Sequence, residues 1–195
     1  EYGVQNFYED LQFLQLKDIN KLAYHYGLSL ILGGAESSLI DLCTTYANLS
    51  STLNYFSKSN GKYRTNEFSK VNYLKKQTVS YGKTTFQPNI YSAGSIWETY
   101  KAMKEVNRPE GDEAWKYYES ALQIAWKSGT SYGNRDAWAI GTNTNYVVGV
   151  WVGNATGEGR PSLTGVSFAA PILFDLFNVL PNNHWFQTPL NDLEE

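Results

Sequence analysis

Cysteine and histidine are nearly absent from this sequence. Cys43 is the only cysteine, and His25 and His184 are the only histidines, among 195 residues. A single cysteine excludes an intramolecular disulfide, and two distant histidines with no cysteine or histidine at ligand spacing argue against a structural zinc site. We therefore expect neither a metal nor another cofactor.

Long apolar runs and repeats are missing as well. No segment approaches the roughly 18 consecutive apolar residues that a membrane-spanning helix needs, and the first residues lack the pattern of a signal peptide. There is no repeat of fixed period and no low-complexity tract, which excludes solenoids and long linkers. Because the chain opens at Glu1 rather than at a methionine and ends in the acidic stretch 191–195, we interpret it as a fragment of a longer protein. Any membrane contact would then come from a part outside this sequence.

Apolar and aromatic residues are abundant, at 42% and 15% of the chain. This composition is sufficient for one domain with a core that needs no disulfide or metal. Charge is unevenly distributed: the window 58–83 holds seven basic residues against Glu67 alone, in a chain of net charge -3. We favour a solvated loop and hairpin there. Contact with an anionic polymer or lipid surface stays open, whereas the window has no motif of a nucleic-acid-binding protein, and we expect no such partner.

Apolar spacing predicts several helices. One covers residues 6–13. A second follows Gly33 and Gly34, with Ser38 as its cap, and places Cys43 on its apolar face, which indicates a core residue rather than a nucleophile. A third starts at the capping pattern of Ser95 and Glu98 and ends near residues 108–111, and a short helix through residues 112–119 follows.

The spacing of apolar residues then changes from 3.6 to 2, which predicts strands. In the first strand Leu122, Ile124 and Trp126 share one face, while Ala125, Lys127 and Gly129 share the other. Further strands are expected at 136–141 and 146–153 with a turn at 142–145, and the segment 169–180, with Pro171 in its first turn, forms an apolar helix that must be buried on the sheet. The fold class is α+β, with one antiparallel sheet flanked by helices. Residues 1–181 form the domain and 182–195 a tail or linker.

Chemistry-bearing residues concentrate at the end of the first strand, in the run Lys127, Ser128, Gly129, Thr130 and Ser131. A cation, a residue without a side chain and adjacent hydroxyls suit a carboxylate ligand. The N–H groups of a strand edge can also hold an extended peptide or an oxyanion. A polar strand end without function is the alternative interpretation of so short a pattern.

The surrounding string, residues 125–138, closely resembles the K-T-G-T-S segment of class A penicillin-binding proteins, particularly of the 1C type. Four further stretches resemble the same family in order and spacing: 26–36, 91–94, 148–153 and 163–173. The resemblance spans about residues 20–181. It implies a partial transpeptidase-like fold in which the motifs S-x-x-K, S-x-N and K-T-G meet beside the edge strand of the sheet.

The resemblance also implies roles for the motif residues. Lys127 would support proton transfer and the field around the nucleophile, and Ser128 would occupy the middle position, which is usually threonine. Gly129 would leave room for the substrate, and the N–H of Thr130 would donate to the oxyanion. The hydroxyls of Thr130 and Ser131 would hold the carboxylate of a peptide or penicillin.

The other two motifs are not found in usable positions. Ser59 and Ser80 match S-x-x-K, but both lie in the irregular basic window and downstream of the order that the family requires, so we reject them as nucleophiles. No S-x-N occurs in the chain. The resemblance therefore implies that the nucleophile lies upstream of Glu1, that this chain alone is inactive, and that its truncated sheet can self-associate.

For the parent protein, the resemblance implies a serine-type DD-transpeptidase that cross-links peptidoglycan stem peptides and binds β-lactams. A glycosyltransferase domain would precede it, and it would act at the periplasmic face of the bacterial inner membrane. Two alternatives stay open: a DD-carboxypeptidase or β-lactam-hydrolysing relative, and a non-catalytic module that binds cell-wall glycan. Arg135, Asp136 and Glu36 are better explained by structural roles than by catalysis.

Overall fold

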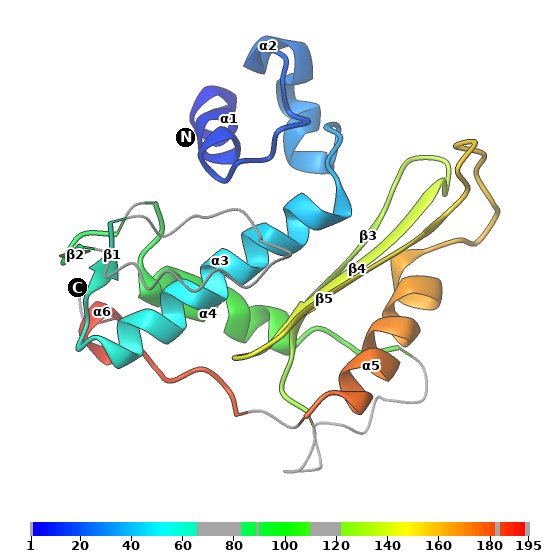
Figure 1. Ribbon diagram of the computed structural model, residues 1–195. Coiled ribbons are helices and arrows are strands. Elements are labelled where there is room, and N and C mark those ends of the chain that lie inside the picture. Colours follow the sequence, from blue (N-terminus) through cyan, green and yellow to red (C-terminus); the bar gives the residue numbers. More distant parts are fainter. Residues whose placement is uncertain (1, 66–82, 89, 110–121, 182–183, 194–195) are drawn as a thin grey trace, which may run out of the picture.

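The computed structural model describes residues 2–65, 83–88, 90–109, 122–181 and 184–193 (Figure 1). Its helices are α1 (Val4–Phe13), α2 (Ala23–Tyr26), α3 (Leu39–Lys58), α4 (Ala93–Lys104), α5 (Ala170–Val179) and α6 (Leu190–Leu193), with a 3₁₀ helix η1 (Gly27–Leu32) and one π-helical turn η3 (Gly165–Ala169). Its strands are β1 (Tyr63–Arg64), β2 (Thr84–Thr85), β3 (Ala125–Thr130), β4 (Asp136–Thr142) and β5 (Val147–Gly153). The predicted α+β class is confirmed.

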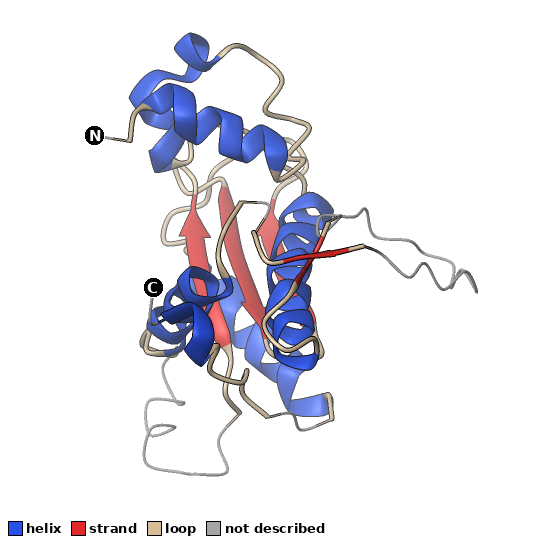
Figure 2. Ribbon diagram, turned by 90° about the vertical axis from the view of Figure 1, so that its left-hand side faces the viewer, coloured by secondary structure: helices blue, strands red, loops and turns tan. Residues whose placement is uncertain are grey.

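The predicted antiparallel sheet is present and has the strand order β3-β4-β5. Figure 2 shows its three strands side by side. Ala125 lies opposite Thr142 at one end, and Thr130 lies opposite Ala137 at the other. The first strand begins at Ala125, three residues later than the pattern from Leu122 predicted, although Leu122 and Ile124 still pack on the expected face.

Alternating side chains of the sheet enter two separate cores. Trp126 is fully buried against Phe174 of α5, with ring centroids 5.3 Å apart, and lies in a cluster with the inward residues of β4 and β5. Its neighbour Ala125 points to the other face and joins the cluster of α3 and α4, which includes Leu53 and Tyr100. The sheet is thus sandwiched, with α3 and α4 on one face and α5 on the other (Figure 1).

Two predicted helix starts had different outcomes. Ser38 caps α3 as predicted, because its Oγ accepts a hydrogen bond from the N–H of Asp41 at 3.2 Å. The predicted start at Ser95 is wrong: α4 begins at Ala93, and the capping oxygen is that of Ser92, which accepts from the N–H of Ser95 at 3.1 Å. This helix also ends at Lys104, before the predicted residues 108–111. The helix predicted over 112–119 lies outside the described residues.

The last helix packs on the sheet as predicted, but it buries only one of its apolar faces. Leu173, Phe174 and Phe177 face the sheet, whereas Ile172, Leu176 and Val179 are 44%, 43% and 78% exposed. Pro171 lies in the first turn of α5, as predicted. An apolar stripe of α5 therefore faces outward, with no described residue packed over it to bury it.

Residues 2–35, which we call the N-terminal lobe, have a small core of their own. Leu16, Ile19 and Leu30 are buried there, and the predicted helix over 6–13 is confirmed as α1. Figure 1 shows the lobe above the start of α3. Leu42 packs against the lobe core, and Tyr91 before α4 donates a hydrogen bond to Asp10 of α1 at 3.5 Å.

Cys43 lies on the face of α3 that approaches β5 and is half-buried. A Cβ added to Gly149 of β5 would lie 2.3 Å from its Sγ, so the glycine allows the helix to approach the strand closely. Burial raises the pKa of the Cys43 thiol. A thiol held in its neutral form is a poor nucleophile, in line with the predicted structural role.

The described residues after 183 pack against the body of the protein. Phe186 is buried, with its ring centroid 5.5 Å from that of Tyr100, and Asp192 of α6 accepts a hydrogen bond from the N–H of Gly94 at 2.7 Å. The boundary near residue 181 stays a prediction.

Candidate active site

The motif strand β3 is an edge strand. One of its sides pairs with β4, and no strand in the described ranges pairs with the other. The N–H of Ser131 donates to the carbonyl of Asp136 at 3.0 Å, which fixes the alternation of hydrogen bonds along the pair. Because alternate residues of an antiparallel strand turn their N–H and C=O groups to opposite sides, those of Lys127 and Gly129 face β4. Those of Ser128 and Thr130 therefore face outward, away from the sheet.

Lys127 is exposed at this open edge. Its Nζ donates to the carbonyl of Ser128 at 2.7 Å, which agrees with the outward direction of that carbonyl. Within the described part of the chain, no carboxylate lies at ion-pair distance from Lys127. The ammonium group therefore lies beside the outward N–H groups, and no carboxylate of the described residues neutralises its charge.

Gly129 has open space on its side-chain face. A Cβ built there would meet only Trp138 Cβ at 3.5 Å, an ordinary contact. The described residues thus provide no packing reason for a glycine at this position, which leaves its free face to a ligand or to another segment.

Gly165, by contrast, is packed tightly against the same strand. A Cβ on Gly165 would lie 2.4 Å from the carbonyl oxygen of Trp138 and 2.5 Å from that of Gly129. The N–H of Gly165 donates to Thr130 Oγ1 at 3.0 Å. Sequence reasoning gave Gly165 no role, and the local signal was limited to the cap made by Thr164, whose Oγ1 accepts from the N–H of Ser167.

Ser131 and Asp136 close the end of the β3–β4 hairpin. Ser131 Oγ donates to Asp136 Oδ2 at 2.7 Å, and the N–H of Asp136 donates back to Ser131 Oγ at 2.8 Å. The other carboxylate oxygen of Asp136 accepts from Trp151 Nε1 at 2.9 Å. Asp136 is therefore a structural tie between all three strands, in line with the role predicted for it, whereas the part of Trp151 had no signal in the sequence.

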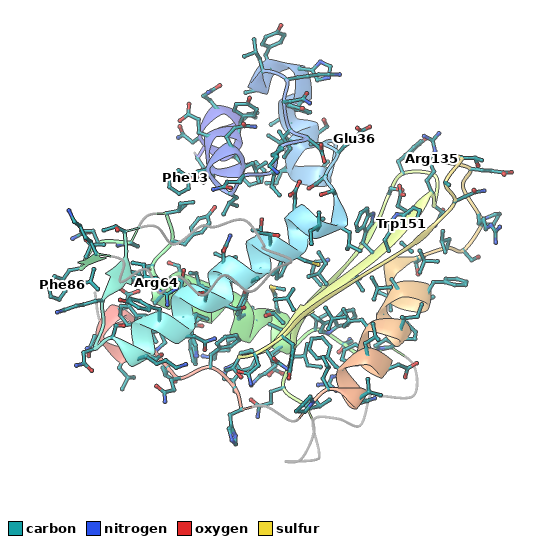
Figure 3. The ribbon with its side chains drawn as sticks, viewed as in Figure 1. Phe13, Glu36, Arg64, Phe86, Arg135 and Trp151 are labelled. Atoms are coloured by element: carbon teal, nitrogen blue, oxygen red, sulfur yellow. The ribbon has the colours of Figure 1, made fainter. Side chains whose placement is uncertain are left out.

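The loop after β5 supports the same hairpin turn. Asn134, at a φ of 54°, donates from Nδ2 to the carbonyl of Leu163 at 2.9 Å and accepts from the N–H of Arg160 at 3.1 Å. Figure 3 shows Arg135 at the tip of this hairpin, with Trp151 lower on the sheet and Glu36 across from it at the base of the N-terminal lobe. The sheet end that carries residues 127–131 is thus braced by residues 160–165.

The surroundings of Ser59 agree with the prediction that it is not the nucleophile. Ser59 follows the last residue of α3, and Asn60 and Gly61 after it have φ angles of 51° and 76°, so this S-x-x-K match does not begin a helix. In Figure 1 the end of α3 lies on the opposite side of the molecule from the β3–β4 hairpin. Ser80 lies outside the described residues.

A cavity of about 560 Å³ lies elsewhere, between α3 and the turn from β4 to β5. It is lined by residues such as Cys43, Asn54, Arg64 and Tyr146, and by none of residues 127–131. The motif residues therefore lie on an open strand edge rather than in this cavity. No described helix is long and apolar enough to span a bilayer, and the described residues contain no cluster of three potential metal-ligating side chains.

Comparisons with known proteins agree with the resemblance of the motif strand. The chain is 32% identical to penicillin-binding protein 1C of Escherichia coli over 160 residues, which are 78% of this chain and 17% of that protein. It is 29% identical to penicillin-binding protein 4 of Bacillus subtilis over 162 residues, 79% of this chain and 23% of that protein. The chain thus spans less than a quarter of these relatives. No protein-family model matches it.

Among solved structures, the crystal structure of penicillin-binding protein 1A from Haemophilus influenzae has the same fold over this length. The superposition has a TM-score of 0.54 at 16% identity and covers 96% of this chain and 33% of that one. The partial coverage agrees with the predicted partial fold. The family resemblance is confirmed, and the chain is homologous to one segment of the penicillin-binding proteins.

Proposed function

We propose that this chain is the part of a serine-type DD-transpeptidase that supplies its third motif, Lys127, Ser128 and Gly129. The observation that carries the proposal is the open edge of β3, where the N–H groups of Ser128 and Thr130 point outward beside the ammonium of Lys127. Two outward N–H groups two residues apart can pair with an extended peptide and donate to a developing oxyanion.

In this proposal a serine of an upstream segment attacks the carbonyl carbon of a stem peptide or β-lactam. The serine oxygen forms an ester with that carbon, its proton passes to the amine that leaves, and Lys127 assists the transfer and stabilises the negative charge. The N–H of Thr130 donates to the oxyanion, Gly129 leaves room for the ligand backbone, and the hydroxyl of Thr130 binds the ligand carboxylate. The resemblance implies that Ser131 binds the same carboxylate, and this role stays a prediction.

The proposal extends to the parent protein. Since the matched residues make up 78% of this chain and 17% of penicillin-binding protein 1C, most of a comparable parent would lie outside this chain. We propose that it includes a glycosyltransferase domain upstream and acts at the periplasmic face of the inner membrane on peptidoglycan stem peptides. Nucleic acid is not among its proposed partners.

Labelling by a fluorescent penicillin tests the proposal. The protein extended upstream to include S-x-x-K and S-x-N should be labelled covalently, and Lys127→Ala should lose the label while keeping its circular dichroism and melting temperature. This chain of 195 residues is the negative control. Product analysis with a stem peptide then separates transfer to an amine from transfer to water, which would indicate a carboxypeptidase.

Two results would contradict the proposal. If the extended protein is folded and takes no label, the chain is better explained as a glycan-binding module. If this chain alone is labelled at Ser59 or Ser80, the nucleophile is not upstream.

A further inference from the structure

Both oxygens of the Asp136 carboxylate accept hydrogen bonds, one from the residue that follows the motif strand and one from β5. Oδ2 accepts from the hydroxyl of Ser131 at 2.7 Å, and Oδ1 accepts from Trp151 Nε1 at 2.9 Å. The backbone of Asp136 adds two further bonds, since its N–H donates to Ser131 Oγ and its carbonyl accepts from the N–H of Ser131. Four hydrogen bonds therefore fix the position where the motif strand ends.

The two hydroxyls that the family resemblance assigns to the ligand carboxylate differ in whether their proton is already donated to a protein acceptor. A hydroxyl has one proton, and that of Ser131 already lies on Asp136. Thr130 Oγ1 accepts from the N–H of Gly165, and this bond leaves the proton of Thr130 available for another acceptor. An anionic ligand at Ser131 would also meet the negative charge of Asp136, which is unfavourable at such short range.

We infer that Asp136 is a positioning residue that acts through Ser131: it holds the end of β3 so that the N–H and the hydroxyl of Thr130 face the ligand, and Ser131 itself does not bind the ligand. The inference rests on the proposed function, because it concerns how that site holds an anionic acyl donor. Trp151 takes part as the donor that fixes the second oxygen of Asp136.

A double-mutant cycle tests whether Ser131 acts only through Asp136. In the upstream-extended protein, the second-order rate of acylation by fluorescent penicillin is measured for Ser131→Ala, Asp136→Ala and the double variant. Each single variant loses two of the four hydrogen bonds, one of which is the bond shared by the two side chains, and should be slowed by about tenfold. The double variant should be slower than Asp136→Ala by much less than the loss seen in Ser131→Ala. The bond between the two side chains is already lost in Asp136→Ala, and Ser131 Oγ keeps only the bond that it accepts from the backbone N–H of residue 136.

A second ligand separates positioning from carboxylate binding. Thr130→Val should lose more with the free acid than with the methyl ester of the same penicillin. The loss common to both ligands reflects the bond from the N–H of Gly165, which valine cannot accept. Ser131→Ala and Asp136→Ala should lose the same factor with both ligands. A general loss of stability would also slow both ligands equally, so it is separated from positioning by the melting temperatures, which are measured for all variants.

Control variants keep the test decisive. Asp175→Ala, on the exposed side of α5, removes a carboxylate far from the motif in sequence and should acylate normally. If Asp136→Ala does not fold, a variant that combines Asp136→Asn and Trp151→Phe replaces it. Asparagine keeps one acceptor oxygen at this position, and phenylalanine removes the N–H that donates to the second carboxylate oxygen.

The outcomes are distinct. Three results would overturn this inference while labelling of the unsubstituted extended protein still upholds the proposed function. They are a loss in the double variant equal to the product of the two single losses, a loss in Ser131→Ala that is confined to the free acid, and the absence of a loss in both single variants. If the unsubstituted extended protein takes no label, both the proposed function and this inference are overturned.

Discussion

At the scale of single residues, two glycines beside the motif strand have opposite reasons to be glycine. Gly165 has no room for a Cβ, because the nearest atoms are the backbone oxygens of Trp138 and Gly129, which cannot move without disturbing the sheet. We expect Gly165→Ala to lower the free energy of unfolding by about 1–3 kcal/mol, as overpacking against fixed groups does. Urea denaturation followed by circular dichroism measures this.

Gly129→Ala is the matched control for that experiment. Its Cβ would make only an ordinary contact with Trp138, so the free energy of unfolding should change by less than about 1 kcal/mol, in either direction. In the extended protein the same substitution should nevertheless reduce labelling by penicillin, because the proposed function assigns the open face of Gly129 to the ligand. Equal losses of stability in the two alanine variants would contradict this distinction.

At the scale of elements, the start of α4 shows where local sequence information ends. Ser92 and Ser95 are both plausible caps, and Glu98 favours Ser95 by pattern alone. The structure selects Ser92 because Tyr63 accepts from the N–H of Ala93 at 2.8 Å and Asp192 accepts from that of Gly94 at 2.7 Å. These two acceptors lie 30 and 98 residues away, so no window of local sequence contains them.

We therefore expect Ser92→Ala to destabilise the protein by about 1 kcal/mol, the usual cost of losing a capping oxygen. Ser95→Ala is the control: it keeps the N–H that the cap binds and removes only an oxygen that accepts from the Ser92 hydroxyl. Its effect on the urea midpoint should be smaller. A larger effect for Ser95→Ala would indicate that the helix starts where the pattern predicted.

The fact that local sequence does not contain distant contacts also explains which parts of the site could be predicted. The alternation of Trp126 with Lys127 and Gly129 reflects local geometry, so the strand and its two faces could be predicted. Residues 127–131 could be identified because they and their sequence neighbours resemble a motif of the family. The bracing contacts come from Trp151 of β5, which bonds to Asp136 at the start of β4, and from Gly165 of η3, which bonds to Thr130 of β3. Only the folded chain brings these elements together.

At the scale of the whole molecule, the chain leaves much apolar surface uncovered. Ile172, Leu176 and Val179 form the outer stripe of α5, and the outer edges of β3 and β5 are unpaired within the described ranges. The N-terminal lobe exposes a second apolar group, which consists of Leu22, Leu28, Ile31 and Leu32. Patches and edges of this kind favour association, because pairing removes apolar area and backbone groups from water.

We expect the isolated chain to self-associate, with a sedimentation coefficient that rises with concentration. Replacing Leu176 and Val179 together by lysine should shift the distribution toward monomer if the α5 stripe is the contact, since two added charges oppose burial. Replacing Leu28 and Leu32 by lysine is the matched test of the lobe, with the same change in charge. A monomer at every concentration would contradict the prediction, whereas association that resists both pairs of substitutions would assign the contact to the strand edges.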